Sequence, residues 1–255
     1  MGMTEMRASQ TPAPDRPSAN RLLAALPRAE YVRLLPYLEK VSLAYQQRLY
    51  DANTPIPYVW FIERGVASVI RDTQDGPLIE ICVIGNEGLV GLPVFLGSES
   101  TPRHVLVQVP GAGLRMRATI FRREVRAGSP LHDLLHPYTQ AIINQMAQGM
   151  VCNRMHSIAQ RCARWLLLTH DRVSSDQFPL TQEFLAHMLG VRRASVSTVA
   201  SKLQKAGLIR YSRGVITILD RPGLEAAACE CYRIIEAEYD RLLGSGTIPR
   251  GACWT

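Results

Sequence analysis

A short run of basic and hydroxyl side chains in the last third of the chain has the composition of a surface that contacts polyanions. The run from Arg192 to Lys202 reads RRASVSTVASK and contains no acidic residue. Guanidinium groups form paired hydrogen bonds with guanine edges, and hydroxyl groups donate to phosphate oxygens. Between Thr181 and Arg213 the chain has six basic side chains and a single acidic one, Glu183, while the whole 255-residue chain has a net charge of only +7. The segment therefore concentrates most of the positive charge, as a nucleic-acid interface does.

The residues around this run have the spacing of two short helices that cross closely. Thr181 is a suitable N-cap for a first helix, and Gly190 tolerates the left-handed backbone of a turn before the second helix. A small residue, Ala186, allows the two helices to approach each other. The apolar residues that are expected to fill the shared core are Leu185, Val191, Val196 and Val199. This pattern predicts a helix-turn-helix.

The segment after the second helix predicts a wing. Gly207 is placed to end the helix, and LIRYSRGVITIL then reads as two strands that turn at Ser212, Arg213 and Gly214. The N-terminal end of the second helix is where a recognition helix reaches base edges, and Arg193 is the best candidate for a bidentate contact to guanine. The predicted DNA-binding residues are Thr181, Gln182, Arg192, Arg193, Ala194, Ser195, Ser197, Thr198, Ser201, Lys202 and Arg213. A solvated pair of charged helices, the alternative, would intersperse Glu and Asp among the Lys and Arg.

The elements that must position this segment begin with a β-rich region. Residues 1–20 are rich in Pro, Ser, Thr and Ala and are expected to be a disordered tail. Short helical pieces interrupted by Pro27 and Pro36 follow. From there to about Arg117, runs such as YVWFIERGVASVIRD and HVLVQVPG alternate with turn residues about every ten positions. Such spacing is typical of an antiparallel barrel or sandwich.

A helical pattern resumes after Pro130. Apolar and small residues then recur at spacings of four and three, as in the seam of a coiled coil. They predict a dimerisation helix over residues 130–156 with the contact residues Leu131, Leu135, Tyr138, Ile142, Gln145 and Gly149. The alternative is a single helix packed on its own β-rich domain.

The six cysteines form no C-x-x-C pair. We interpret them mainly as small buried apolar residues, with a redox sensor as the alternative. Cys229 and Cys231 are two positions apart on a predicted helix and are expected to point to different faces, which argues against a joint site. No metal site is predicted.

Three features together resemble the Crp/Fnr family of bacterial transcription regulators: a β-rich region, a long helix and a winged helix. The resemblance runs from about Leu22 to Leu243 and is most specific in LTQEFLAHMLGVRRASVSTVASKLQKAGLI. It implies an α+β fold with an N-terminal antiparallel, jelly-roll-like double-stranded β-roll over 21–129, the dimerisation helix over 130–156 and a winged helix-turn-helix over 157–245. Residues 246–255 would be a C-terminal tail.

The resemblance also implies partners and a function. It implies a homodimer that binds a palindromic operator in double-stranded DNA, with two recognition helices about 34 Å apart, and RNA polymerase as a further partner. Arg193 matches an arginine of the cyclic-AMP-responsive members. Ala194 and Thr198 replace a glutamate and an arginine of those members, so the operator is expected to differ.

The glycine-rich segment GNEGLVGLPVFLGSESTPRH, residues 85–104, corresponds to the cyclic-nucleotide cassette of that family. With Gly91 aligned to the cassette glycine, Leu92 stands where a carboxylate should hold the ribose. Arg103 matches the phosphate-binding arginine, but His104 replaces a small hydroxyl residue. An unpaired ribose hydroxyl would cost about 1–3 kcal/mol if buried. We therefore predict that cyclic AMP is not the effector. The β-roll would either bind an unidentified small-molecule effector at these four residues or serve as a structural module that sets the dimer. A cyclic-nucleotide-responsive factor with a non-standard pocket is the alternative.

Other cofactors and function classes have little support in the sequence. No cysteine precedes Cys82, which excludes the family's N-terminal iron–sulfur site, and His104 or the pair His132 and His136 are conceivable haem ligands but are more simply surface or hydrogen-bonded histidines. The sequence has no nucleophile elbow, Walker loop or H-E-x-x-H motif of an enzyme. Apolar runs fall short of the roughly 20 residues of a membrane span, and the N-terminus lacks a signal-peptide stretch. We expect a cytoplasmic protein without a cofactor.

Overall fold

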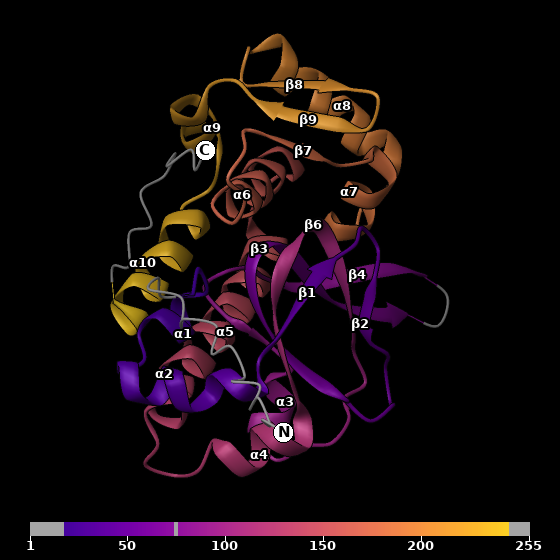
Figure 1. The fold of residues 1–255 in the computed structure, drawn as a ribbon. Helices are drawn as coiled ribbons and strands as arrows, with labels where there is room; N and C mark the ends of the chain where they lie inside the picture. Colours follow the sequence, from indigo (N-terminus) through magenta and orange to yellow (C-terminus); the bar gives the residue numbers. More distant parts are fainter. Residues whose placement is uncertain (1–17, 74–75, 245–255) are drawn as a thin grey trace, which may run out of the picture.

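The computed structural model describes residues 18–73 and 76–244, in which a β-roll and a winged helix lie at opposite ends of the molecule (Figure 1). Residues 1–17 of the predicted N-terminal tail and the predicted tail over 246–255 lie outside the described residues. The prediction that residues 18–20 belong to a disordered tail is wrong. Asn20 is fully buried and donates to the carbonyl oxygens of Ile62 and Gly88 at 2.9 and 2.8 Å, and Ser18 donates to Glu63 at 2.7 Å.

Short helices precede the sheet. The Asn20 side chain accepts a hydrogen bond from the Leu23 backbone amide and so caps the first of them. Leu22 and Leu23 are buried in the core, which fixes this helix on the β-roll. The N-terminal helical elements are α1 (Arg21–Ala24), α2 (Arg28–Leu34) and the 3-10 turn η1 (Leu35–Tyr37).

The β-roll is one antiparallel six-stranded sheet in which β6 and β3 are the central pair, with the order β1-β6-β3-β4. β2 also pairs with β6, and β5 with β3. Irregular pairing between β3 and β6 near Gly111 bends the long strands, and a Cβ on Gly111 would lie 1.9 Å from the Arg64 carbonyl oxygen. The strands are β1 (Glu39–Leu43), β2 (Arg48–Tyr50), β3 (Tyr58–Thr73), β4 (Gly76–Ile84), β5 (Leu89–Val90) and β6 (His104–Arg117). Two short helices, α3 (Leu92–Phe95) and α4 (Ala118–Glu124), complete it.

The long helix α5 (Pro130–Met155) leads from the β-roll to the C-terminal part. Ser129 caps it by accepting a bond from the His132 amide. One face packs on the β-roll, where the Tyr138 hydroxyl donates to the Leu89 carbonyl oxygen at 3.0 Å. A second face packs against α10 (Cys231–Leu243), which runs beside α5 (Figure 1).

The predicted contact residues of the long helix therefore do not face a partner chain. Five of the six, Leu131, Leu135, Tyr138, Ile142 and Gln145, are buried within the protein itself. Gln145 donates to the Val83 carbonyl oxygen and accepts from the Tyr239 hydroxyl. Their assignment to a dimer seam is wrong, because the periodicity that we read as a coiled-coil seam marks the face that covers the β-roll. The sixth, Gly149, is half-buried.

The C-terminal part is a three-stranded sheet with helices packed on it. Ser157 begins its first helix in a capping box with Gln160. The sheet has the strand order β7-β9-β8. The elements are α6 (Ile158–His170), β7 (Gln177–Pro179), α7 (Gln182–Leu189), α8 (Arg193–Lys205), β8 (Ile209–Ser212), β9 (Val215–Ile218) and α9 (Arg221–Ala227).

The two ends of the molecule share one continuous hydrophobic core. α7 packs on β4, and the rings of Tyr45 and Phe184 lie 6.5 Å apart across this boundary. Among residues 18–73 and 76–244, none of the helices combines the length and the apolar character that a membrane span needs.

Candidate nucleic-acid interface

The turn between α7 and α8 has the capping residues that the sequence predicts. The Thr181 Oγ1 accepts a hydrogen bond from the Phe184 amide at 3.1 Å and caps α7. Gly190 ends α7 with a left-handed φ of 63°. The Val191 amide then donates to the Ala186 carbonyl oxygen at 3.0 Å, and α8 begins two residues later. Three residues thus reverse the chain between the two helices.

The shared core of the two helices is the predicted one. Leu185, Ala186, Val196 and Val199 are buried, and Val191 is half-buried between them. Burial of this face orients α8 so that its opposite face is exposed. The helix-turn-helix prediction is confirmed.

The exposed face of α8 carries the predicted contact residues. The side chains that are exposed on it and just before it are Arg192, Arg193, Ala194, Ser197, Thr198, Ser201 and Lys202. Ser195, predicted to contact phosphate, is half-buried. The Thr198 hydroxyl donates to the Ala194 carbonyl oxygen at 3.1 Å, so its hydrogen is used within the helix.

The wing follows the predicted turn. β8 and β9 pair in register from Ile209 opposite Ile218 to Ser212 opposite Val215. Arg213 and Gly214 both have positive φ, 50° and 75°, as the two central residues of a tight hairpin turn require. Arg213 is exposed at the tip.

The wing is also fixed to the start of α7. The Tyr211 hydroxyl donates to the Leu180 carbonyl oxygen at 2.9 Å. The Leu180 amide donates to the Gly214 carbonyl oxygen at 2.8 Å. Thr181 is exposed and Gln182 half-buried beside this junction. The predicted DNA-binding residues on α7, α8 and the wing are therefore held in one rigid unit.

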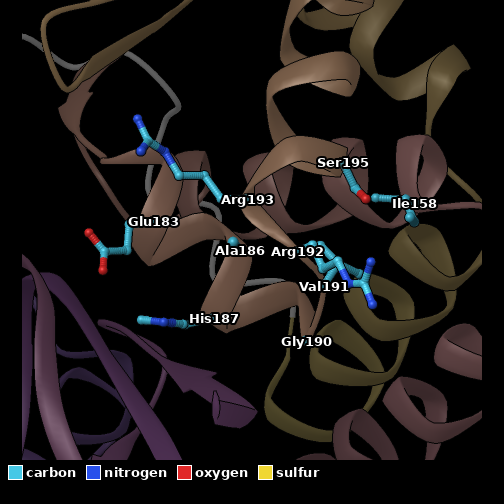
Figure 2. Close-up of a pocket in the computed structure, with 9 residues that line it drawn as sticks. All are labelled: Ile158, Glu183, Ala186, His187, Gly190, Val191, Arg192, Arg193 and Ser195. Atoms are coloured by element: carbon cyan, nitrogen blue, oxygen red, sulfur yellow. The ribbon is translucent and has the colours of Figure 1, made fainter. Parts of the chain in front are cut away.

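A groove lies beside the turn, between α7 and the start of α8 (Figure 2). Its lining includes Glu183 and His187 from α7 and Arg192 and Arg193 from α8. Figure 2 shows the Arg193 side chain directed outward from the start of α8. The groove adjoins the candidate interface, because the predicted contact residues Arg192, Arg193 and Ser195 line its α8 side.

Three of the four glycines of the predicted effector loop are packed by side chains of the protein itself, whereas the fourth, Gly97, has open space where a Cβ would lie. A Cβ on Gly85 would lie 2.5 Å from the Arg172 Cγ, and one on Gly88 would lie 2.4 Å from the Tyr138 hydroxyl oxygen. Gly91 has a φ of 106° and a Cβ there would lie 2.9 Å from the side chain of Val59. These contacts explain the three glycines without a bound molecule.

The other predicted effector residues also contact the protein. Arg103 Nε donates to the Thr101 hydroxyl at 3.2 Å. His104 is buried, with its Nδ1 3.3 Å from an Asp72 carboxylate oxygen but without hydrogen-bond geometry. Leu92 packs against the hydrophobic core. An effector-binding role for Gly91, Leu92, Arg103 and His104 stays a prediction.

Buried polar contacts that the sequence did not predict join the β-roll to α6. Glu87 and Arg172 form an ion pair at 2.9 Å, and both side chains are only 6% exposed. Burial by itself would lower the pKa of Arg172, but the charge and hydrogen bond of Glu87, together with the smaller effects of Tyr239 and Asp171, raise that pKa. In addition, the Trp165 indole donates to Glu80 at 2.7 Å. The partners are 85 residues apart in both cases, so no local pattern could have indicated them.

The cysteines also differ from the prediction. α9 ends at Ala227, Cys229 lies in the connection that follows, and Cys231 is the first residue of α10. Because this connection is not helical, the two side chains converge on Cys152 and His156. The prediction that Cys229 and Cys231 point to different faces is wrong. Cys253 lies outside the described residues.

The two histidines that the sequence offers as conceivable haem ligands contact an aromatic ring. His132 and His136 lie one turn apart on α5, with ring centroids 4.6 Å apart and edge to face. Both also contact the Phe95 ring edge to face. The pair is thus part of a ring cluster.

Comparison with known proteins agrees with this geometry. Residues 160–227 match a family model described as a Crp-like helix-turn-helix domain. No curated protein matches the chain by sequence.

Solved structures share the fold over most of the chain. A protein of Eubacterium rectale assigned to the Crp/Fnr family of transcriptional regulators has a TM-score of 0.63 at 18% identity, over 79% of this chain and 94% of its own. The CRP-family regulator TTHB099 of Thermus thermophilus has a TM-score of 0.61 at 18% identity, over 74% and 96%. FixK2 of Bradyrhizobium japonicum has a TM-score of 0.61 at 15% identity, over 75% and 98%. The chain has the α+β fold of Crp/Fnr transcriptional regulators, and the resemblance inferred from the sequence is confirmed.

Proposed function

We propose that this protein is a sequence-specific transcriptional regulator that binds a palindromic operator in the cytoplasm as a homodimer, without cyclic AMP as its effector. The observation that carries the proposal is the winged helix-turn-helix, whose exposed α8 face bears Arg193 and Lys202 with no acidic neighbour on that helix. The fold that it shares with Crp/Fnr regulators supports the same function.

The side chains divide into two groups by the contacts they suit. Arg193, at the N-terminal end of α8, suits a bidentate contact to guanine in the major groove. Ala194 and the Thr198 methyl group suit apolar contact with a thymine methyl, since the Thr198 hydroxyl already donates within the helix. Lys202 and Arg213 suit contact with phosphates on either side, which position the protein without reading sequence.

The homodimer proposal rests on a face of α5 that the rest of the described protein leaves exposed. Exposed residues recur on it at spacings of four and three, the repeat of a coiled-coil seam. They are His136, Gln140, Ile143, Ala147, Met150 and Arg154. Ile143 is 50% and Met150 70% exposed, which is unusual for apolar side chains that lie on one helix face. We propose that a second copy of the chain covers this face.

The side chains that fill the loop over residues 85–104 support the proposal that cyclic AMP is not the effector. Leu92 lacks the carboxylate that would hold a ribose, and Tyr138 and Arg172 fill the space beside Gly88 and Gly85. RNA polymerase and an unidentified effector remain predicted partners.

One experiment tests the dimer and the operator together. Duplexes selected from a random pool by the wild-type chain are expected to contain two symmetric half-sites with centres about 10 base pairs apart. The double variant Ile143→Glu, Met150→Glu places two charges on the exposed face of α5 and is expected to be monomeric in light scattering. Its affinity for the selected duplex is expected to fall at least about 100-fold, because each half-site must then be bound separately.

Val32→Glu is the matched control, because Val32 is an apolar side chain 47% exposed that lies on α2, outside the exposed face of α5. It should leave both the mass and the affinity unchanged. A double variant that remains dimeric would contradict the proposed face. Selection that enriches no symmetric site would contradict the proposed function itself.

A further inference from the structure

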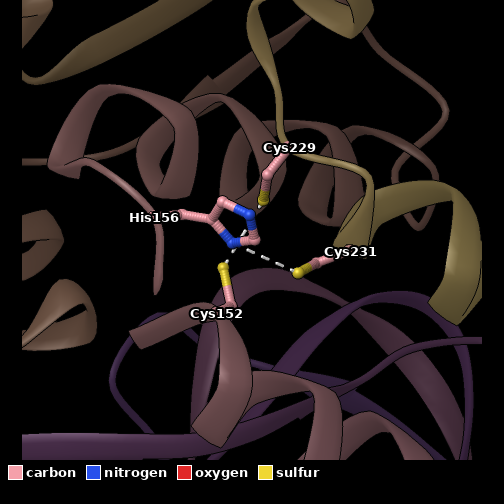
Figure 3. A group of neighbouring side chains, drawn as sticks. All are labelled: Cys152, His156, Cys229 and Cys231. Carbon is pink, nitrogen blue, oxygen red and sulfur yellow. Dashed lines mark hydrogen bonds between the residues drawn. The ribbon is translucent and has the colours of Figure 1, made fainter. Parts of the chain in front are cut away.

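Three cysteines and one histidine converge where α5 ends and α10 begins. We call Cys152, His156, Cys229 and Cys231 the cysteine–histidine cluster (Figure 3). Cys152 and His156 are one turn apart at the end of α5, Cys229 lies in the connection after α9, and Cys231 is the first residue of α10. The group therefore joins segments that are more than 70 residues apart.

The spacing of the four ligand atoms fits a single four-coordinate metal ion. The Sγ atoms of Cys152 and Cys229 are 3.5 Å apart, and the His156 Nδ1 is 3.5 Å from the Cys231 Sγ. All four atoms lie within 4.8 Å of one another. Two sulfurs bound 2.3 Å from a tetrahedral zinc ion would be roughly 3.8 Å apart. Small movements of side chains would thus complete a tetrahedron.

The surroundings of the cluster orient these ligands. The His156 Nε2 lies 3.1 Å from a Glu230 carboxylate oxygen, so that Nδ1 is directed at the sulfurs. A carboxylate on the far nitrogen is the usual partner of a histidine that ligates metal. The Gln148 amide also donates to the Cys231 Sγ at 3.1 Å. Simple hydrophobic packing of thiols would require neither contact.

The cluster is closed to solvent and has a positive charge beside it. Cys152 and Cys231 are fully buried, Cys229 is 4% exposed and the His156 side chain 12% exposed. A zinc ion with three thiolates and a neutral imidazole has a net charge of −1. The Arg161 guanidinium, half-buried on α6, interacts electrostatically with Cys152 and Cys229 and would offset that charge.

We propose that Cys152, His156, Cys229 and Cys231 bind one zinc ion in a structural site. A closed set of four nitrogen and sulfur ligands is typical of structural rather than catalytic zinc. The close spacing of all four ligand atoms favours one ion over an iron–sulfur cluster, which holds its ligands farther apart. This proposal is independent of the proposed function.

The ion would lie where it can hold several segments of the chain together. His156 is the C-cap of α5, and Ser157 begins α6, so the site lies at the junction between the long helix and the DNA-binding part. Arg161, beside the cluster, also donates to the carbonyl oxygen of Leu189 at the end of α7. The ion would thus fix α5, the α9–α10 connection and, through Arg161, the helix-turn-helix relative to one another.

The test is the metal content of the full-length chain, purified without chelator. About one zinc ion per chain is expected by mass spectrometry. Wild-type protein stripped with a chelator should bind Co²⁺ and develop the thiolate charge-transfer and visible bands of a tetrahedral cobalt site. Cys229→Ala should lose most of both signals, whereas His156→Cys should keep the metal and shift the cobalt spectrum.

Cys162→Ala is the matched control, because Cys162 is also a buried thiol but lies outside the cluster. It should retain zinc at the wild-type level. Wild-type protein that contains no zinc and binds no Co²⁺ would overturn the proposal, as would iron together with sulfide. The cobalt titration of the wild type decides the matter even if Cys229→Ala fails to fold.

Discussion

Replacing Arg172 by alanine is expected to lower the free energy of unfolding by about 3–5 kcal/mol, since it leaves the Glu87 carboxylate charged and buried without its partner. Arg172 Nε donates to Glu87 at 2.9 Å, and its Nη1 donates to the Leu168 carbonyl oxygen at 2.7 Å. The carboxylate accepts its other hydrogen bonds from the Gly85 amide at 3.1 Å. The pair thus fixes the glycine-rich loop to the end of α6.

Urea denaturation of single and double variants measures this coupling. The double variant Glu87→Ala, Arg172→Ala should lose less stability than the sum of the losses of the two single variants, because it leaves no unpaired buried charge. Arg48→Ala breaks the exposed pair with Asp51 and is the control, expected to cost less than about 1 kcal/mol. A loss of that same small size for Arg172→Ala would contradict the account of this contact.

The second large effect concerns a buried carboxyl in a chain of hydrogen bonds between the β-roll and α6. The Ser68 hydroxyl lies 2.7 Å from both a Glu80 oxygen and the Gln108 Oε1. The Gln108 amide donates onward to Thr169, and Trp165 donates to the other Glu80 oxygen. One hydroxyl hydrogen cannot serve two acceptor oxygens, so this arrangement is satisfied when Glu80 carries a proton and donates to Ser68.

The stability of the protein should therefore depend on pH through Glu80. Burial raises the pKa of Glu80 from 4.5 to about 7, against the smaller lowering effect of its hydrogen bonds. Since the pKa is higher in the folded state, stability falls as pH rises from about 4.5 to about 7 and then stays constant. The total loss is about 3 kcal/mol for a shift of this size.

Glu80→Gln keeps the shape of the side chain without its titration. Its midpoint of urea unfolding should exceed that of the wild type at pH 8 and match it much more closely at pH 5. Glu99→Gln, at a side chain 78% exposed, is the control and should follow the wild type at both values. A wild-type protein whose stability is unchanged between pH 5 and 8, or rises, would contradict a buried neutral Glu80.

The helix-turn-helix could be predicted because its constraints are local. Thr181, Ala186 and Gly190 each satisfy a steric or capping requirement within ten residues of chain, and the structure confirms all three. Alternating runs and turns likewise predicted an antiparallel barrel or sandwich, while the β-roll itself was implied by the family resemblance. The strand pairing itself joins distant segments, such as Glu39 opposite Arg115, and no local pattern indicates it.

The long helix shows the limit of such patterns. A repeat of four and three residues marks any helix face that packs along its length, whether on the same chain or on a partner. α5 has one such repeat through Leu135 and Ile142, which covers the β-roll, and another through Ile143 and Met150, which is exposed. The sequence predicts the helix but does not tell which repeat meets which neighbour.

The cysteine–histidine cluster and the contacts of Glu80 and Glu87 depend on where distant segments meet. Cys229 and Cys231 converge only because α9 ends at Ala227, one residue before an extended backbone at Ala228. If the chain were helical through Ala228, Cys229 and Cys231 would point to different faces, as the sequence predicted. Tertiary placement, rather than residue type, decides these sites.

The most direct test of the central claim, that α8 reads DNA sequence through Arg193, is an anisotropy titration on the selected operator. Arg193→Ala should lose about 1–3 kcal/mol of binding free energy and its preference at the contacted guanine. Lys202→Ala should instead weaken binding to operator and unrelated duplexes alike and reduce the salt dependence of binding. An Arg193→Ala protein that binds the operator as tightly as the wild type, with the same base preference, would contradict the account.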